Sequence, residues 1–325
     1  MGHARVIALL SFAVIGIVQA VPACAQAYPT RPIRMVVGFP PGGFTDILAR
    51  QVSDRLTPVM GQQIVVDNRG GQAGIIGADI VAKSKPDGYT LLMGHNNSNA
   101  VAPSLYAKLP YDVRKDFVPI ALSGSVATVL VVHPSVPAKT MKEFIAVVAS
   151  TKGQFRVASA GVGSTQHLAI ERFKLATGTQ LIHVPYKGSG PAISDLVAGQ
   201  IQSILTPAPG IVPQVQGGKL RALAVTSDKR SVTLPDVPTF VELGFGNLRV
   251  YNWYGVLAPA QTPPEIIVKL NMAIRDVMAI PAVLERLNGQ LLEPINSTPQ
   301  EFKALLERDA QTWANIVKTA QIKPE

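Results

Sequence analysis

The strongest constraint on the fold is an apolar run that passes through a glycine turn directly into a helical pattern. Residues 33–37 read Ile-Arg-Met-Val-Val, residues 40–43 read Pro-Pro-Gly-Gly, and helical periodicity begins at Thr45. Because the first N–H groups of a helix have no intrahelical partners, a small-residue turn there lets an anionic oxygen approach them. The glycines are adjacent and no Gly-Lys-Ser/Thr follows, which excludes a phosphate loop or dinucleotide fingerprint. The stretch therefore predicts an anion site or simply a tight strand-to-helix turn.

Short apolar runs then alternate with helical periods as far as Leu122. The expected strands are 33–37, 64–68 and 89–94, and the expected helices are 45–60 and 75–82. This spacing favours right-handed βαβ units and a mostly parallel sheet covered on both faces, with ligands beyond the carboxyl ends of the strands. The three loops that follow these strands, 39–45, 69–74 and 95–99, are rich in Gly, Asn and Ser. Their convergence on one edge predicts a binding site.

A second unit repeats this arrangement after residues 127–132. A strand at 156–159 leads through small residues to a helix whose N-cap is Ser164, and another small-residue turn follows the strand at 181–184. The chain is expected to cross back near 249–254, so we assign residues 26–125 and 250–325 to lobe 1 and 126–249 to lobe 2. Capping boxes are predicted at Thr140/Glu143, Thr262/Glu265 and Thr298/Glu301.

The first 25 residues have the pattern of a secretory signal peptide. Arg5 precedes an apolar run at 6–18, and Ala-Cys-Ala at 23–25 supplies small residues for cleavage. The mature chain then begins at Gln26, or at Tyr28 if cleavage follows Ala27. Cys24 is the only cysteine, and a lipoprotein acylated at Cys24 is the less favoured alternative. A thiol-free mature chain suits an oxidising compartment such as the periplasm, and the remaining sequence has no apolar stretch long enough to span a membrane.

The charge pattern gives little support for nucleic-acid binding. The chain carries a formal net charge of +9, and loss of Arg5 with the leader leaves +8. The basic residues are scattered singly with few aromatic residues among them, which is typical of a solvated surface. The excess positive charge weakly favours anionic ligands.

Catalytic and metal sites are poorly supported. Ser164 and His167 would share a helix face, as a secreted hydrolase would need, but Ser164 reads as a cap and no Gly-x-Ser-x-Gly elbow is present. The histidines lack metal-ligand spacing, so no metal site is expected. His95, in a strand-end loop, is a candidate ligand contact, whereas His183 reads as a strand residue with a satisfied hydrogen bond. Asp46 is expected to hold the helix end, with contact to the ammonium of an amino-acid ligand as the alternative.

Five segments together resemble the Bug-type (Bordetella uptake gene) periplasmic solute receptors, which are similar to the TctC components of tripartite tricarboxylate transporters. They are PPGGFTDILAR (40–50), LPYDVRKDFVPI (109–120), SAGVGSTQHLAIERFK (159–174), HVPYKGSGPAISDLVAGQI (183–201) and LPDVPTFVELG (234–244). The resemblance spans essentially the whole mature chain. It implies an α/β two-lobed Venus flytrap fold, each lobe a mostly parallel sheet flanked by helices, that holds a small carboxylate without chemistry or cofactor.

The resemblance also implies the site residues. With His95 from the loop pattern, the predicted ligand contacts are Phe39, Gly42, Gly43, Thr45, His95, Ser159, Ala160, Gly163, Ser164, His167 and Tyr186, and Lys187 is a neighbour. The implied ligand is a dicarboxylate, amino acid or aromatic acid. The resemblance also implies that the receptor is a monomer and that its partners are the membrane subunits of a transporter. Gln72 and the amide-rich loop 95–99 depart from the family pattern. The resemblance therefore does not predict the chemical group at the end of the ligand away from its carboxylate.

Two other functions remain open at this point. One is a secreted hydrolase that uses Ser164 and His167. The other is a ligand sensor whose closed form acts on a signalling partner.

Overall fold

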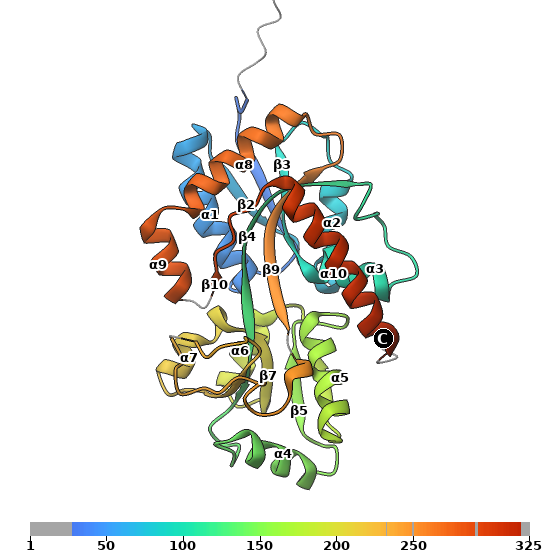
Figure 1. Cartoon of the computed structure of the whole chain (residues 1–325), viewed down its shortest axis with the longest axis vertical. Helices are drawn as coiled ribbons and strands as arrows, with labels where there is room; N and C mark the ends of the chain where they lie inside the picture. The colour runs from blue at the N-terminus through green and yellow to red at the C-terminus, as the bar shows by residue number, and fades with distance from the viewer. Residues whose placement is uncertain (1–27, 232, 249, 290–291, 320–325) are drawn as a thin grey trace, which may run out of the picture.

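The computed structural model describes residues 28–319 except 232, 249 and 290–291. The predicted signal peptide, its cleavage positions and Cys24 lie outside the described residues. Two α/β lobes lie one above the other along the long axis (Figure 1), which confirms the two-lobed fold class. Within the part of the chain described, no helix is long and apolar enough to cross a membrane.

The elements follow the expected order with small shifts in their ends. The strands are β1 (Ile33–Val37), β2 (Ile64–Asn68), β3 (Thr90–His95), β4 (Phe117–Val132), β5 (Arg156–Ser159), β6 (Ile182–Pro185), β7 (Ser203–Pro207), β8 (Arg221–Val225), β9 (Tyr251–Pro259) and β10 (Leu292–Glu293). The helices are α1 (Phe44–Met60), α2 (Ile75–Ala82), α3 (Ala102–Leu105), α4 (Met141–Ser150), α5 (Thr165–Thr177), α6 (Ser189–Val197), α7 (Val212–Gln216), α8 (Pro264–Met278), α9 (Pro281–Gly289) and α10 (Pro299–Thr319).

Both lobes have mixed sheets. In lobe 1, β1 pairs parallel with β2 and β3, but β9 is antiparallel to both β3 and β4. In lobe 2, β5 is parallel to β6 and β7, whereas β4 is antiparallel to β7 and β8. The βαβ units are therefore parallel as predicted. The sheets as a whole are not mostly parallel, because β9 in lobe 1 and β4 in lobe 2 are antiparallel to their neighbours.

Strand β4 belongs to both sheets. Residues 117–127 pair with β9, and residues 128–132 pair with β7 and β8. The sequence pattern predicted the start of a second unit near residue 127, and the change of partners falls there, inside one continuous strand. The lobe boundaries at 125/126 and 249/250 stay a prediction.

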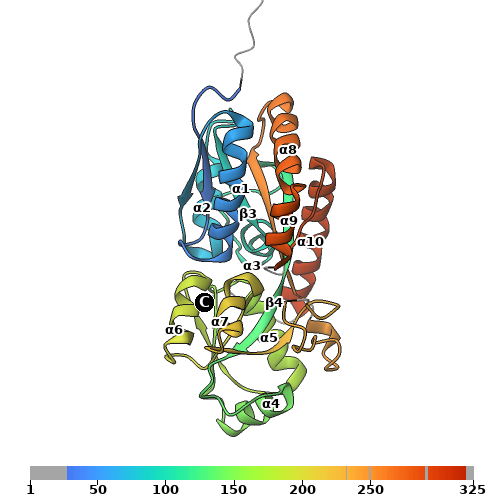
Figure 2. The same ribbon diagram turned by 90° about the vertical axis from the view of Figure 1, so that its left-hand side faces the viewer.

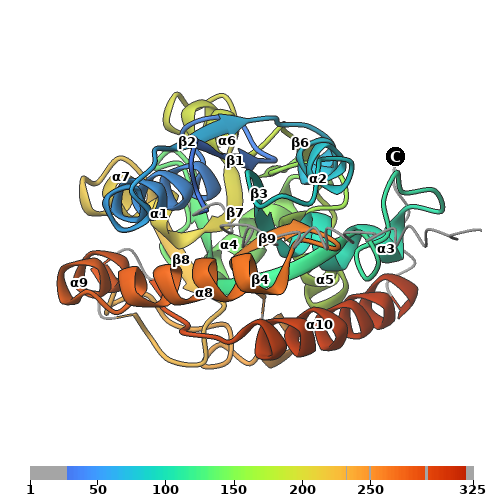
Figure 3. The same ribbon diagram turned by 90° about the horizontal axis from the view of Figure 1, so that it is seen from above.

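The lobe 1 sheet is covered on both faces because its strands are apolar on both sides. Ile33, Met35 and Val37 of β1 join a core with α1 and α8, whereas Val36 joins the core on the side of α2 and α10. This period of two is what a strand requires. Seen from above, α1, α8 and α9 lie on one side of the sheet, and α2, α3 and α10 lie on the other (Figure 3). Figure 2 views the molecule from the first of these sides.

Two of the three predicted capping boxes are present. The Thr140 hydroxyl accepts from Glu143 N at 3.2 Å, and that of Thr298 accepts from Glu301 N at 3.2 Å. The prediction at Thr262 is wrong, because the Thr262 hydroxyl donates to Pro259 O at 2.7 Å and α8 has Pro263 as its N-cap. The preceding strand thus takes the hydroxyl that the pattern assigned to the helix.

Phe302 packs α10 against β9. We expect replacement of its side chain by a smaller one to destabilise the protein strongly. Its ring is fully buried, meets Trp253 edge-on at 5.3 Å and fills the space beside Gly255, where a Cβ would lie 2.5 Å from it. We expect Phe302→Ala to lower the free energy of unfolding by about 3–5 kcal/mol because it leaves a cavity. Urea unfolding measures the change. The adjacent exposed Lys303→Ala should cost less than about 0.5 kcal/mol, and equal effects would contradict the assignment.

Candidate ligand-binding site

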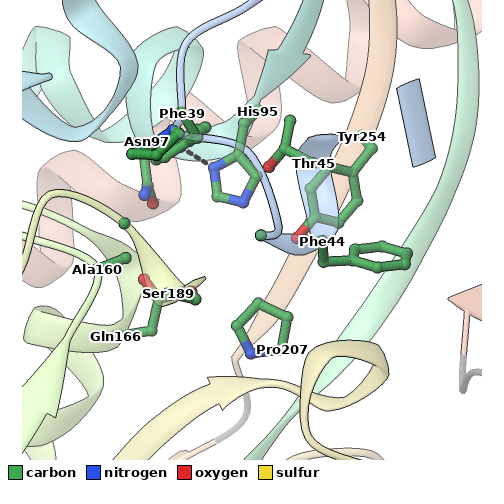
Figure 4. A pocket seen from close by; sticks show the side chains of 13 residues that line it. Phe39, Phe44, Thr45, His95, Asn97, Ala160, Gln166, Ser189, Pro207 and Tyr254 are labelled. Carbon is green, nitrogen blue, oxygen red and sulfur yellow. Dashed lines mark hydrogen bonds between the residues drawn. The ribbon is translucent and has the colours of Figure 1, made fainter. Parts of the chain in front are cut away.

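A small cavity lies between the lobes, where loops from both sheets meet (Figure 4). Its volume is about 20 Å³, close to the space for one water molecule. Both lobes supply its wall, which is lined by Phe39, Pro40, Gly43, Phe44, Thr45, His95, Asn97, Ala160, Gln166, Gly188, Ser189, Pro207 and Tyr254. The β1–α1 turn and the end of β3 contribute from lobe 1, and the β5–α5 and β6–α6 turns contribute from lobe 2. Two of the three loops predicted to converge, 39–45 and 95–99, therefore meet at the cavity, whereas loop 69–74 contributes no lining residue.

Asp46 holds the β1–α1 turn in shape. Its carboxylate accepts from Gly42 N at 3.0 Å and from Asn68 Nδ2 at 3.0 Å, and it pairs with Arg50 at 2.9 Å. Burial alone would raise the pKa of Asp46, but the bonds from Arg50, Gly42 and Asn68 outweigh it and leave the pKa below its ordinary value. These contacts give Asp46 the expected structural role at the helix end.

His95 is a neutral member of the wall. It is 3% exposed, and burial lowers its pKa to about 3. Its Nδ1 accepts from Asn97 N at 3.0 Å, the dashed line in Figure 4. The ring lies 5.4 Å from Phe39 and 4.9 Å from Tyr254 between centroids. Tyr254 contacts Phe44 in turn, so four aromatic rings form one side of the cavity.

Asn97 connects the two lobes. It begins the π-helix η2 (Asn97–Val101), and its Oδ1 accepts from Thr165 N, the first residue of α5, at 2.8 Å. The Thr165 hydroxyl donates to Asn252 Oδ1 at 2.5 Å, and Asn252 Nδ2 donates to Thr128 Oγ1 at 2.9 Å. Because Thr128 and Asn252 lie on β4 and β9, the interlobe contact is continuous with the strands that join the lobes.

Three helices begin at the cavity wall. Phe44 and Thr45 open α1, Gln166 is in the first turn of α5, and Ser189 opens α6. A helix N-terminus carries a partial positive charge and free N–H groups. Three of them around one cavity favour an anion there.

The predicted site residues divide into two groups. Phe39, Gly43, Thr45, His95 and Ala160 line the cavity. Six others lie outside the lining, namely Gly42, Ser159, Gly163, Ser164, His167 and Tyr186. Each of the six has a contact that accounts for its position.

Two of these six residues, Ser159 and His167, contact His183. The His167 and His183 rings stack with centroids 4.0 Å apart, and His183 Nε2 lies 2.6 Å from Ser159 Oγ. The His183 prediction, a strand residue with a hydrogen bond, is thus confirmed. Ser164 Oγ accepts from His167 N at 3.2 Å, as an N-cap does, and His167 Nδ1 accepts from Gly163 N. These bonds use Ser164 for helix capping and give no support to a hydrolase.

The remaining three residues shape the loops. Gly42 has φ of +83° and donates its N–H to Asp46. Gly163 has φ of +73°, and a Cβ there would lie 2.9 Å from Leu105 of lobe 1. The Tyr186 hydroxyl donates to Asp195 at 2.7 Å.

Eight lining residues were not predicted: Pro40, Phe44, Asn97, Gln166, Gly188, Ser189, Pro207 and Tyr254. Most are sequence neighbours of predicted contacts, and the amide-rich loop already singled out Asn97. Tyr254 comes from β9, where an apolar strand pattern gave no sign of it.

A polar site enclosed between two α/β lobes defines the class of two-lobed solute-binding proteins. The description "Tripartite tricarboxylate transporter family receptor" belongs to the family model that matches residues 48–322. The chain is 38% identical to Protein BugT of Bordetella pertussis over 324 residues, 99% of each chain. The chain therefore belongs to the tripartite tricarboxylate transporter family receptors, as the sequence resemblance predicted.

Two solved structures with bound ligands are close in fold. Rpa4515 of R. palustris, with adipate, has a TM-score of 0.89 and 34% identity, covering 92% of this chain and 100% of that chain. MatC (Rpa3494) from Rhodopseudomonas palustris, with bound malate, has a TM-score of 0.85 and 32% identity, covering 89% of this chain and 100% of that chain.

The bonds of Asp46 predict a pH-dependent contribution to stability. We expect Asp46→Asn to lower the free energy of unfolding by about 1–2 kcal/mol at pH 7, because charge-assisted bonds are lost. The folded-state pKa is depressed, so the stabilisation is complete above the ordinary value of 3.8 and is lost as the pH falls through the folded-state pKa. Urea unfolding at pH 7 and pH 3 measures the difference in free energy of unfolding between Asp46→Asn and the wild type. This difference should become smaller only at pH 3. Asp54→Asn, on the exposed side of α1, is the control, and a gap independent of pH would contradict the role of the charge.

Proposed function

We propose that this receptor captures a small carboxylate between its lobes and delivers it to the membrane subunits of a tripartite tricarboxylate transporter. The observation that carries the proposal is the set of uncharged donors which both lobes direct at one cavity beside three helix N-termini. Neutral N–H and hydroxyl groups that are fixed in place stabilise a carboxylate without a basic side chain. The adipate and malate bound by the two relatives belong to this chemical class.

Asn97 supplies one such donor. Its Oδ1 is occupied by Thr165 N–H, and its buried Nδ2 has no partner among the described residues. A buried amide without a partner costs free energy, which a ligand oxygen would recover. The ligand contacts in this proposal are Phe39, Gly43, Thr45, His95 and Ala160 from the sequence prediction, together with Asn97, Gln166, Ser189 and Tyr254.

Access to the cavity requires the lobes to separate. Backbone segments of the two lobes touch directly at the cavity, since a Cβ on Gly190 would lie 3.3 Å from Pro41 O and 3.5 Å from Gly43 N. A ligand larger than water does not fit in 20 Å³ without movement. We propose that β4 and β9 act as the hinge and that the ligand shifts the population toward the closed form.

The remaining parts of the proposal follow the sequence prediction. The protein acts as an exported periplasmic monomer, cleaved after Ala25 or Ala27, and it releases its ligand unchanged. In this role Ser164 remains a helix cap.

Gly43 and Lys187 separate a backbone-donor site from a salt-bridge site. A Cβ at Gly43 would lie 3.8 Å from Pro40 O and 4.0 Å from Gly190 N of lobe 2, whereas Lys187 is exposed and outside the lining. We expect Gly43→Val to weaken binding at least about tenfold and Lys187→Ala to change it less than about twofold. Calorimetry with whichever of succinate, malate, adipate or benzoate binds the wild type measures both. If none of the four acids binds at micromolar affinity, the proposed function fails. If Lys187→Ala weakens binding more than Gly43→Val does, the ligand is held by a salt bridge instead.

Gly190 tests the requirement for closure. The substitution Gly190→Val would hold the lobes apart at the Pro41–Gly43 backbone, so we expect ligand affinity to fall at least about tenfold while urea stability stays within about 0.5 kcal/mol. A Cβ added at Gly246 would meet no described atom within 4 Å, so Gly246→Val is the matched control and should bind as the wild type does. Unchanged affinity in Gly190→Val would contradict closure at this contact.

A further inference from the structure

A groove in lobe 1 lies apart from the interlobe cavity. Its volume is about 610 Å³, which is within the range of small-molecule sites, and its lining shares no residue with that of the cavity. It runs between α10 and the connection from α3 to β4, which lie next to each other at one side of lobe 1 (Figure 1). The groove is therefore a separate place where a ligand could bind.

The floor of the groove is apolar. Tyr111 and Phe117 meet edge-on with their centroids 5.5 Å apart, and both are buried, as is Leu306. Ala310 and Ala314 lie about one turn apart on α10, and their small side chains leave space between this helix and the connection. A ligand with an apolar body would remove this hydrocarbon surface from water.

Asn99 supplies a hydrogen-bond donor at the groove. Its side chain is fully buried, and its Oδ1 accepts from Ser98 Oγ at 2.8 Å and from His95 N at 3.4 Å. Because a backbone N–H can only donate, the second contact identifies which end of the amide is the oxygen. Nδ2 is then the buried end that has no partner among the described residues. A ligand oxygen that accepts from Nδ2 would recover the free energy that an unpaired buried donor costs.

The charged residues of the lining leave a positive excess. Asp112 is already occupied, since it pairs with Lys115 at 3.3 Å and accepts from Arg114 N at 2.9 Å. The side chains of Arg114, Lys303 and Glu307 are exposed and form no ion pair within the part of the chain described. Two cations and one anion therefore remain, which favours an anionic ligand over a cationic one.

From these features we infer a second binding site in lobe 1, which takes an amphipathic anion. The ligand has an apolar body that covers the floor, an oxygen that accepts from Asn99 Nδ2, and a negative charge attracted by Arg114 and Lys303. An alkyl or aryl carboxylate or sulfonate meets these conditions. The inference does not depend on the proposed function, because the two sites have no residue in common.

A fluorescent anion tests where such a molecule binds. Anilinonaphthalene sulfonate becomes fluorescent in an apolar site, and titration of the whole protein with it measures its affinity. We expect Ala310→Phe, which fills the groove, to weaken dye binding at least about tenfold. Ala304→Phe adds the same ring at an exposed position of α10 outside the lining, so it is the matched control and should bind as the wild type does. Gly43→Val, in the wall of the interlobe cavity, should also leave dye binding unchanged.

Displacement of the dye tests the chemical class of the ligand. Octanoate and octylammonium have the same chain and opposite charge, and octanoate should displace the dye at least about tenfold more effectively. Asn99→Asp replaces the free donor by an oxygen of the same shape, so octanoate should bind at least about tenfold more weakly. Lys303→Gln should weaken octanoate binding about two- to fivefold, whereas Lys318→Gln, exposed on the same helix outside the lining, should not.

Several results would contradict the inference. It is wrong if the dye does not bind, if Ala310→Phe folds and binds the dye as tightly as the wild type, or if Gly43→Val abolishes the signal. It is also wrong if octylammonium displaces the dye as well as octanoate does. If Asn99→Asp shows no cooperative urea transition, Lys303→Gln decides the role of charge in its place. None of these results bears on ligand capture in the interlobe cavity, so the inference and the proposed function fail separately.

Discussion

The continuous backbone pairing of β4 is the constraint on which the rest of the structure depends. Its 16 residues must keep their N–H and C=O groups bonded while the strand leaves one sheet and enters another. It does so by exchanging β9 for β7 and β8 at Ala127 and Thr128, with no loop between. The lobes are therefore joined by extended strands, which can bend and twist while their ladders stay intact.

Polar side chains at this crossing link the strands that join the lobes to the loops of the cavity wall. Thr128, Asn252 and Thr165 are each fully buried, and their side chains are bonded to one another. Because buried polar groups are costly unless paired, this network favours one relative position of the lobes. Asn97 joins this network because its Oδ1 accepts from Thr165 N–H. The residue whose buried Nδ2 has no partner among the described residues is therefore also bonded to lobe 2.

The sequence predicted those features that depend on neighbours along the chain. The strand–turn–helix units, the caps at Thr140 and Thr298 and the role of Asp46 follow from local hydrogen bonding and hydrophobic period, and the structure contains them. The Thr262 prediction failed because Pro259 O, three residues earlier at the end of β9, takes the same hydroxyl.

The candidate site was predictable to the level of loops and only partly to the level of side chains. The period of a helix places Ser164 and His167 on one face, but it cannot show that His183 from a neighbouring strand stacks on that face. Tyr254 enters the wall from β9, more than 150 residues after His95, through sheet pairing that local pattern does not encode. Long-range strand order decides which residues of a correctly predicted loop meet the ligand.

The contrast between a basic surface and a neutral cavity explains how attraction and selection can be separated. The net charge of the chain acts over a Debye length and draws anions without distinguishing them. Inside the closed lobes the oriented amides, hydroxyls and helix ends act at hydrogen-bond distance, where solvent screening is small. In the proposed binding mode, selection among anions depends on whether the buried Asn97 Nδ2–H and the helix N–H groups meet acceptors of the ligand, since a donor left unmatched when the lobes close is costly.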